Sequence, residues 1–269
     1  MSAINEVTDL RLEGEVAVLT LNSPPVNALS AGVRTGLLEG ISAANLNDDA
    51  RAIVLICEGR TFIAGADITE FGGGGPSGAS LTDVQSAMQS AKKPVVAAIH
   101  GTALGGGLEV ALCAHFRVAV PSARCGLPEV NLGLLPGAGG TQRLPRIVGV
   151  ETALSMVTSG RHVPAPECLE LGLVDELVEE GSLLDGAIAF ARKVLAEGRP
   201  LRKVDEANEK VEAARGKPEI FEAFRAGIAR KARGFLAPEY NIRCIEAAVN
   251  ESFEDGLKAE GRLFLELLR

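Results

Sequence analysis

The sequence has no tryptophan and a single tyrosine, Tyr240, and aromatic residues make up only 4% of its 269 residues. So few rings leave little for the stacking platforms that bind single-stranded nucleic acid. Asp and Glu number 35 against 27 Lys and Arg, a net charge of −8, so the chain as a whole repels a phosphate backbone or an anionic membrane surface. We therefore expect neither nucleic acid nor a membrane as a partner.

Cysteine is sparse and scattered. The five cysteines are too far apart for any Cys-x-x-Cys pair, which leaves no legible zinc site or disulfide framework. They are Cys57, Cys113, Cys125, Cys168 and Cys244. None has basic neighbours in sequence, so a small buried side chain is favoured over a nucleophile at each. The chain start lacks a basic and apolar leader, and apolar runs such as residues 52–57 are too short to span a membrane. We expect a reduced, cytoplasmic protein.

Glycine is abundant, at 31 residues, yet the glycine-rich nucleotide motifs are missing. No Lys followed by Ser or Thr comes after residues 101–106, which excludes a phosphate-binding loop, and residues 137–142 lack the last glycine of the dinucleotide fingerprint. The chain has no Gly-x-Ser-x-Gly elbow, and His100, His115 and His162 occur in unrelated contexts. A structural or surface role is favoured for each histidine.

Apolar runs of strand length alternate with helical patterns in the first part of the chain. Residues 15–22, 52–57 and 94–99 are rich in Val, Ile, Leu and Ala, and Ser30 precedes a helical apolar stripe. Buried strands that alternate with helices indicate an α/β domain. Further short strands are predicted at residues 116–120, 125–129 and 174–178.

From Ser182 onward the apolar residues follow a helical period to the end of the chain. We therefore predict a core at residues 1–195 and a helical C-terminal region at residues 196–269, used for packing and oligomerisation. The glycine-rich residues 72–78 cannot offset the loss of their backbone entropy without a partner, which predicts a mobile surface loop. A lid over a substrate is the alternative for this loop.

A triple glycine, Gly105-Gly106-Gly107, opens a predicted helix shortly after the strand at residues 94–99. The first backbone N–H groups of a helix have no partner within it, and glycine lets a ligand oxygen approach them closely. Glu109 follows at helical spacing, so its carboxylate lies on the same face as these amides. Its neighbours are apolar, which favours an acid or base beside an oxyanion donor over a glutamate that faces water.

A second isolated carboxylate, Glu129, follows Pro128 in an apolar, strand-like setting. Two lone acids in apolar surroundings suggest an acid/base pair with shifted pKa values. Spacing along the chain does not establish that Glu109 and Glu129 meet. The loop at residues 62–68, rich in small side chains, taken alone is interpreted as a tight connection between a strand and a helix.

Three segments, taken together and in order, resemble the enoyl-CoA hydratase (crotonase) family. They are Phe62-Ile63-Ala64-Gly65-Ala66-Asp67-Ile68-Thr69-Glu70-Phe71, Ala103-Leu104-Gly105-Gly106-Gly107-Leu108-Glu109, and the stretch from Leu127 to Leu144. The resemblance runs from about Val16 to Val178. Residues 24–30 and 253–257 are similar to the hydratase part of multifunctional fatty-acid oxidation enzymes, which continue into a dehydrogenase. The chain is thus expected to be a stand-alone relative or an excised domain.

The resemblance implies a crotonase-like spiral of ββα units followed by a helical C-terminal region. It implies that the amides of Ala66 and Gly106 bind the oxygen of a CoA thioester substrate, and that Glu109 and Glu129 hold the water that adds to it. Further implied contacts are the Gly137 backbone with that water and three residues along the CoA channel, namely Ala64, Asp67 and Ile68. Neither a metal nor a redox cofactor is implied. The implied assembly is a homo-oligomer, a trimer or a dimer of trimers.

Two other functions remain open. Enoyl-CoA isomerisation uses the same oxyanion hole but works with one carboxylate, so the retention of both glutamates favours hydration. A non-catalytic RNA-binding or scaffold protein is disfavoured by the acidic balance of the chain. Residues 192–233 carry 12 Lys and Arg against 7 Asp and Glu, a local charge of +5. This segment is interpreted either as a solvated helix face or as a place for the phosphates of CoA.

Overall fold

The computed structural model of this chain describes residues 2–72 and 77–269, which form two compact units. The first unit comprises residues 1–125 and 163–203, and the second comprises residues 126–162 and 204–269. This division differs from the boundary predicted at residue 195, because residues 126–162 belong with the C-terminal helices. Residues 73–76 of the predicted glycine-rich loop lie outside the described residues, so neither the mobile loop nor the lid is tested.

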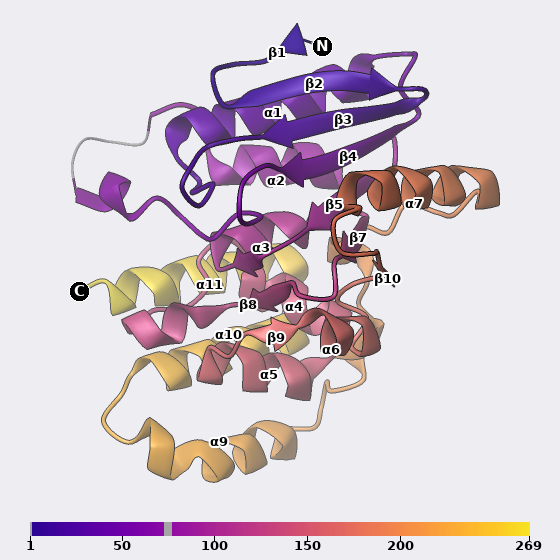
Figure 1. Cartoon of the computed structure of the whole chain (residues 1–269). Helices are drawn as coiled ribbons and strands as arrows, with labels where there is room; N and C mark the ends of the chain where they lie inside the picture. Colours follow the sequence, from indigo (N-terminus) through magenta and orange to yellow (C-terminus); the bar gives the residue numbers. More distant parts are fainter. Residues whose placement is uncertain (1, 73–76) are drawn as a thin grey trace. The chain divides into compact units, whose positions relative to one another are not determined.

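The first unit is built on a seven-stranded sheet (Figure 1). Its order is β1 (Ser2–Ala3), β2 (Thr8–Glu13), β3 (Val16–Leu21), β4 (Ala52–Cys57), β5 (Val95–Ile99), β7 (Phe116–Ala119) and β10 (Glu176–Leu177). Strands β1 to β3 pair antiparallel, and every pairing from β3 to β10 is parallel. A second, three-stranded sheet has the order β6 (Thr102–Leu104), β8 (Arg124–Gly126) and β9 (Val163–Pro164).

Helices cover the central strands on both faces. Strands β3 and β5 are buried at every position, which explains their continuous apolar runs. The helix α1 (Ala31–Leu46) packs on β2, β3 and β4, and α7 (Leu183–Glu197) packs on β4 and β5. The predicted start of α1 is confirmed, since the Ser30 side chain accepts a hydrogen bond from the Val33 amide at 3.3 Å. The other elements of the unit are η1 (Ile68–Gly72), α2 (Leu81–Gln89), α3 (Gly106–Ala111) and α6 (Ala165–Glu170).

The strand predicted at residues 125–129 is wrong in its second half. Strand β8 ends at Gly126, and a 3₁₀ helix, η2 (Pro128–Leu132), carries Glu129. Pro128 has no backbone N–H for a sheet ladder, and its fixed φ suits the first position of a helix. The predicted strand at residues 174–178 is reduced to β10.

The second unit is helical, as predicted for the C-terminal part of the chain. Its helix α10 (Ala237–Asn250) is central and packs against α4 (Gly140–Val148), α5 (Val150–Ser159), α9 (Glu219–Ala232) and α11 (Phe253–Leu267). The unit also contains η2, η3 (Val204–Glu206) and α8 (Glu209–Glu212). The packing of α10 on α4 and α5 is what joins residues 126–162 to the C-terminal helices.

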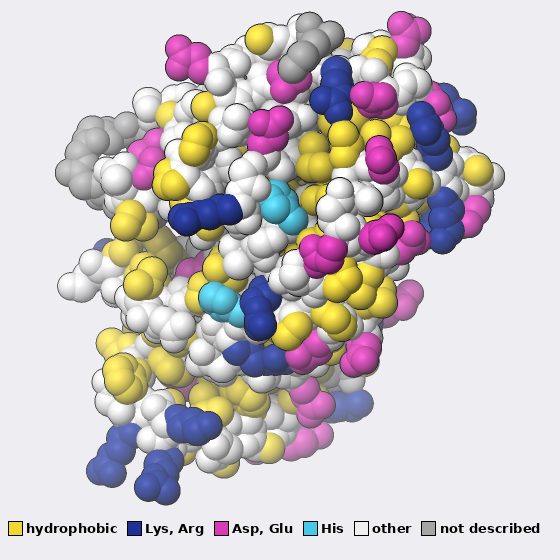
Figure 2. Space-filling view, viewed as in Figure 1, with side chains coloured by type: hydrophobic (Ala, Val, Ile, Leu, Met, Phe, Trp, Pro, Cys, Tyr) yellow, Lys and Arg dark blue, Asp and Glu magenta, His cyan; other side chains and the backbone are white. Residues whose placement is uncertain are grey.

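The cationic segment predicted at residues 192–233 is divided between the units, and several of its charges are paired. Arg225 of α9 bridges Glu239 at 2.8 Å and Glu246 at 2.6 Å, and Lys193 of α7 pairs with Glu176 at 3.1 Å. Figure 2 shows Lys and Arg side chains gathered over the surface that α9 occupies in Figure 1. A role for this segment in binding phosphate stays a prediction. In the described part of the chain, no helix combines the length and apolar character needed to cross a bilayer.

His115 is a buried histidine in the first unit, with 1% of its surface exposed. Its Nδ1 accepts a hydrogen bond from the Val95 amide at 3.0 Å. Burial lowers the pKa of His115 to about 4, and three nearby positive charges act in the same direction: Lys203, Arg117 and Arg202. The imidazole is therefore neutral in the folded protein at neutral pH.

This buried imidazole predicts a loss of stability in mild acid. Between its unfolded pKa of about 6.5 and the folded value of about 4, only the unfolded chain takes up the proton, so stability falls as pH is lowered. The contribution of His115 is on the order of 3 kcal/mol across this range. Urea unfolding between pH 7 and pH 4 is expected to show a weaker pH dependence in His115→Gln. The exposed His162→Gln is the control, and an equal pH dependence in both variants would contradict the prediction.

Candidate active site

Two loops meet at the carboxyl edge of the parallel sheet. Strands β4 and β5 are adjacent and parallel, so the chain leaves both at the same edge, where open α/β sheets bind their ligands. The Phe62 amide donates to the His100 carbonyl at 2.8 Å, and the Leu104 amide donates to the Ile63 carbonyl at 3.3 Å. These hydrogen bonds fix the loop after β4 against the loop after β5.

The two loops bring Ala66 and Gly106 together. A Cβ atom placed on Gly106 would lie 3.6 Å from the backbone nitrogen of Ala66. Gly106 is the first residue of α3, where an amide has no partner within the helix. Among the described residues, neither the Ala66 amide nor the Gly106 amide has a hydrogen-bond acceptor. Two adjacent N–H donors are thus available to a ligand oxygen, and their role in binding a thioester stays a prediction.

The backbone explains why residues 105 and 107 of the triple glycine are glycines. Gly105 adopts φ +55°, a conformation that favours glycine. At Gly107 a Cβ atom would lie 1.9 Å from the Ile63 carbonyl oxygen, so α3 approaches the backbone of the loop after β4. The sequence indicated glycines that let a ligand approach the helix. The structure adds a second reason at Gly107, which is the close packing of the α3 backbone on the Ile63 backbone.

Glu109 lies one helical turn from Gly106 in α3 and is 2% exposed. Its amide donates to the Gly105 carbonyl at 2.9 Å, and its own carbonyl accepts from Gln85 Nε2 at 3.3 Å. The neighbouring helix residues are buried as well. This burial excludes the alternative in which Glu109 faces water, and it places a carboxylate in the same unit as the paired amides.

The residues predicted along the CoA channel lie on the loop that carries Ala66. Ala64 and Asp67 are partly buried, and Ile68 is 74% exposed. The Asp67 carboxylate accepts from the Thr69 hydroxyl at 2.6 Å and from the Thr69 amide at 3.0 Å, and these hydrogen bonds lower the pKa of Asp67. They order the start of η1.

Sequence reasoning missed two residues that hold this loop. Glu70 accepts from the Ala31 amide at 2.7 Å and pairs with Arg34 of α1 at 2.8 Å. Arg34 also donates to the Leu29 carbonyl at 2.6 Å. The acidic Glu70 inside the first motif was the available signal, but nothing in the sequence identifies Arg34 as its partner.

The remaining predicted residues, Glu129 and Gly137, belong to the second unit. Glu129 is partly buried in η2, which ends at Gly133 in the left-handed conformation with φ +74°. Gly137 is exposed on the turn before α4, and a Cβ atom there would lie 2.9 Å from Cδ2 of the Phe264 ring. Glu109 belongs to the first unit, so the pairing of the two glutamates stays a prediction.

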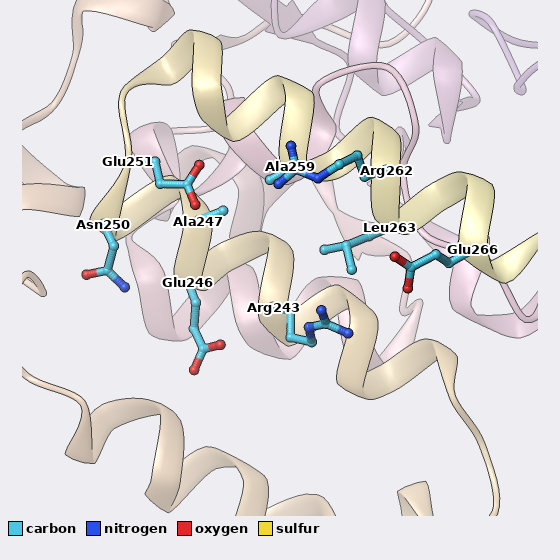
Figure 3. A pocket seen from close by; sticks show the side chains of 9 residues that line it. All are labelled: Arg243, Glu246, Ala247, Asn250, Glu251, Ala259, Arg262, Leu263 and Glu266. Atoms are coloured by element: carbon cyan, nitrogen blue, oxygen red, sulfur yellow. The ribbon is translucent and has the colours of Figure 1, made fainter.

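Two cavities, one in each unit, are lined by other residues than these. A cleft of about 270 Å³ lies between α10 and α11, and charged side chains line it together with Leu263 (Figure 3). The charged residues are Arg243, Glu246, Glu251, Arg262 and Glu266. A cavity of about 460 Å³ in the first unit is lined by Cys57, among others. All five cysteines are buried, as predicted, and burial raises the pKa of Cys57. Among the described residues, no group of His, Cys, Asp or Glu is placed to hold a metal ion.

An α/β fold with paired backbone amides at the carboxyl edge of a parallel sheet is typical of enzymes that stabilise an oxyanion. Residues 11–223 match the family model for enoyl-CoA hydratase/isomerase, and the chain belongs to this family. Solved structures with this fold include an enoyl-CoA hydratase/isomerase from Pseudoalteromonas atlantica. It is 26% identical with a TM-score of 0.69, and the match covers 98% of this chain and 92% of that one.

Two curated relatives are similar over much of the sequence. A peroxisomal bifunctional enzyme from Danio rerio is 44% identical over 94% of this chain and 34% of its own length, so the chain spans about a third of that relative. A probable enoyl-CoA hydratase from Bacillus subtilis is 42% identical over 68% of this chain and 74% of its own.

These similarities confirm the predicted family, the enzyme class and the crotonase-like fold, with its parallel sheet and helical C-terminal region. Relatives named as fatty-acid oxidation enzymes also support the predicted area of metabolism. Several of the relatives are named peroxisomal or glyoxysomal, so the cytoplasmic location is not confirmed and stays a prediction.

Proposed function

We propose that this protein adds water to a trans-2-enoyl-CoA and forms a 3-hydroxyacyl-CoA. The observation that carries the proposal is the adjacent pair of amides at Ala66 and Gly106, with the buried Glu109 one turn further along α3. When water adds to the double bond, negative charge develops on the thioester oxygen. Preorganised donors stabilise that charge, and loss of one such donor typically raises the barrier by about 2.7–4 kcal/mol.

The two glutamates divide the proton transfers in this proposal. Glu109 positions the water and accepts a proton from it as the oxygen bonds to the β carbon, and Glu129 delivers a proton to the α carbon. In a reaction that uses two carboxylates on one water, the apparent pKa values of the pH–rate profile are assigned to the pair and not to either residue. The Gly137 backbone contacts the water, and Ala64, Asp67 and Ile68 line the path of CoA. Addition of water is neither an oxidation nor a reduction, so no redox cofactor is required, and in this proposal the two amides and the two glutamates take the roles that a metal ion would otherwise fill.

The proposed functional form is a homo-oligomer, a trimer or a dimer of trimers, without nucleic acid or membrane. Large apolar side chains on the second unit support a protein partner: Phe235 is 70% exposed, Leu236 69% and Leu265 59%. Sedimentation of the purified protein tests the assembly.

Loss of the conjugated absorbance of crotonyl-CoA and of longer straight-chain enoyl-CoAs tests the hydratase activity. Absence of turnover with every chain length would overturn it. The alternative within the family is isomerisation, which uses the same amides. A gain of conjugated absorbance from 3-enoyl-CoA, without consumption of 2-enoyl-CoA, would establish the isomerase instead.

Gly106→Pro is expected to lower kcat/KM by about a hundredfold or more, since it removes one of the two donors. Proline is well tolerated at the first position of a helix, and the atom nearest to the added Cβ is the flexible end of the Leu29 side chain, at 2.9 Å. Gly106→Ala adds the same Cβ and keeps the N–H, so it is the matched control. Equal losses in the two variants, measured with crotonyl-CoA, would contradict the role of the amide.

A further inference from the structure

The turn that carries Gly137 is held by a carboxylate from the far end of the chain. Glu260 of α11 is 2% exposed. Its Oε1 accepts from the Gly139 amide at 2.7 Å, and its Oε2 accepts from the Thr141 amide at 3.2 Å and from the Thr141 hydroxyl. Three donors of residues 139–141 therefore converge on one buried side chain.

The Thr141 hydroxyl connects Glu260 to a second side chain of α4. Gln142 Nε2 donates to Thr141 Oγ1 at 2.9 Å, and the same hydroxyl donates to Glu260 Oε2. Gln142 Nε2 also donates to the Cys244 carbonyl of α10 at 2.9 Å, so the hydrogen bonds at the start of α4 reach both α10 and α11.

Glu260 caps the N-terminus of α4, which has no capping side chain of its own. Helix α4 begins at Gly140, and its N-cap, Gly139, has φ +83° and no side chain with which to satisfy the first amides. The carboxylate satisfies them from α11, 119 to 121 residues further along the chain. On the other side of the turn, Arg143 donates to the Ala138 carbonyl at 3.2 Å.

Helix α11 also contacts the turn at Gly137, two residues before Gly139. A Cβ atom on Gly137 would lie 2.9 Å from Cδ2 of the Phe264 ring. Phe264 follows Glu260 by one helical turn in α11. A single face of α11 thus fixes both the exposed Gly137 and the amides that follow it.

We propose that Glu260 is a positioning residue that holds the Gly137 backbone in place for the reacting water. This inference rests on the proposed hydration, in which Gly137 contacts that water. Glu260 itself is buried in the turn and acts only through it. Since misplacement of a reacting group by about 1 Å can cost about 10²-fold in rate, a loosened turn lowers kcat more than substrate affinity.

The test compares Glu260→Gln, Thr141→Val and Thr141→Ser with the wild type. Glutamine keeps the size of the side chain but turns an NH₂ group toward amide donors. Valine keeps the shape of Thr141 without its hydroxyl, and serine keeps the hydroxyl. The exposed Glu266→Gln, on the same helix, is the control. We expect kcat for crotonyl-CoA to fall about ten- to a hundredfold in Glu260→Gln, less in Thr141→Val, and little in Thr141→Ser.

Two further measurements separate positioning from general damage. KM is expected to change less than threefold, and amide hydrogen exchange is expected to accelerate at residues 139–141 while the rest of the second unit keeps its protection. An unchanged kcat, a KM that rises by the same factor as kcat falls, or a loss explained by unfolded protein would overturn the proposal. If the wild type hydrates no enoyl-CoA, the proposed function fails and the positioning role falls with it, whereas the exchange data still show whether Glu260 holds the turn.

Discussion

Glu129→Gln is expected to abolish most hydration of crotonyl-CoA while leaving acyl-CoA binding intact. The substitution removes the proposed proton donor and changes little in shape. A positioned general acid or base typically contributes about 10²–10⁴-fold, so kcat is expected to fall by this factor. Steady-state kinetics measures the loss, and titration with a saturated acyl-CoA, which cannot react, measures the binding.

The exposed Glu151→Gln, in the first turn of α5 of the same unit, is the matched control. Equal losses of turnover and binding in Glu129→Gln would indicate a structural glutamate. Full hydration by Glu129→Gln, beside an inactive Glu109→Gln, would contradict the role of Glu129 as proton donor and leave Glu109 as the one carboxylate that the reaction needs.

Gly107→Ala is expected to lower the free energy of unfolding by about 3 kcal/mol or more, at the upper end of the cost of overpacking. The added Cβ atom would lie 1.9 Å from the oxygen and 2.7 Å from the carbon of the Ile63 carbonyl. Both are backbone atoms, so no side-chain rotation relieves the overlap. The loop after β4 has to move, and Ala66 moves with it, so we expect activity to be lost as well.

Gly227→Ala in α9 is the same substitution without the overlap, since no atom lies within 4 Å of its added Cβ. Alanine is the better helix former, and this control is expected to gain roughly 0.5–1 kcal/mol. Urea unfolding followed by circular dichroism compares the two variants. If Gly107→Ala unfolds at the same urea concentration as Gly227→Ala, the packing of α3 on the loop is not rigid and the prediction is wrong.

The buried strands could be predicted from the sequence because their signal is local. Strand β3 lies within residues 15–22, and β4 coincides with residues 52–57, since runs of aliphatic residues identify strands covered on both faces. Strand β2 was missed, because its sequence TDLRLE mixes charged residues with apolar ones at the antiparallel side of the sheet. The helical η2 was missed because Pro128, which favours the first position of a helix, was assigned to a strand.

Much less of the candidate site could be predicted, because it depends on residues that are far apart in the sequence. The burial of Glu109 could be inferred from its apolar neighbours, but the approach of Gly106 to Ala66 depends on pairing between two loops after different strands. The sequence implied that approach only through the family resemblance. Glu260 gave no signal at all, because a glutamate on an amphipathic helix is usually exposed, and its partners lie more than 100 residues earlier in the chain.

The donors at Ala66 and Gly106 belong to the main chain, and this determines which experiments can detect them. Every residue except proline presents the same N–H group, so an alanine scan would leave both donors of the proposed oxyanion site in place. Replacement of a single peptide amide by an ester, introduced by chemical ligation, would remove one donor and keep every side chain. By the same reasoning, side chains along the proposed CoA path can be substituted without the loss of either donor.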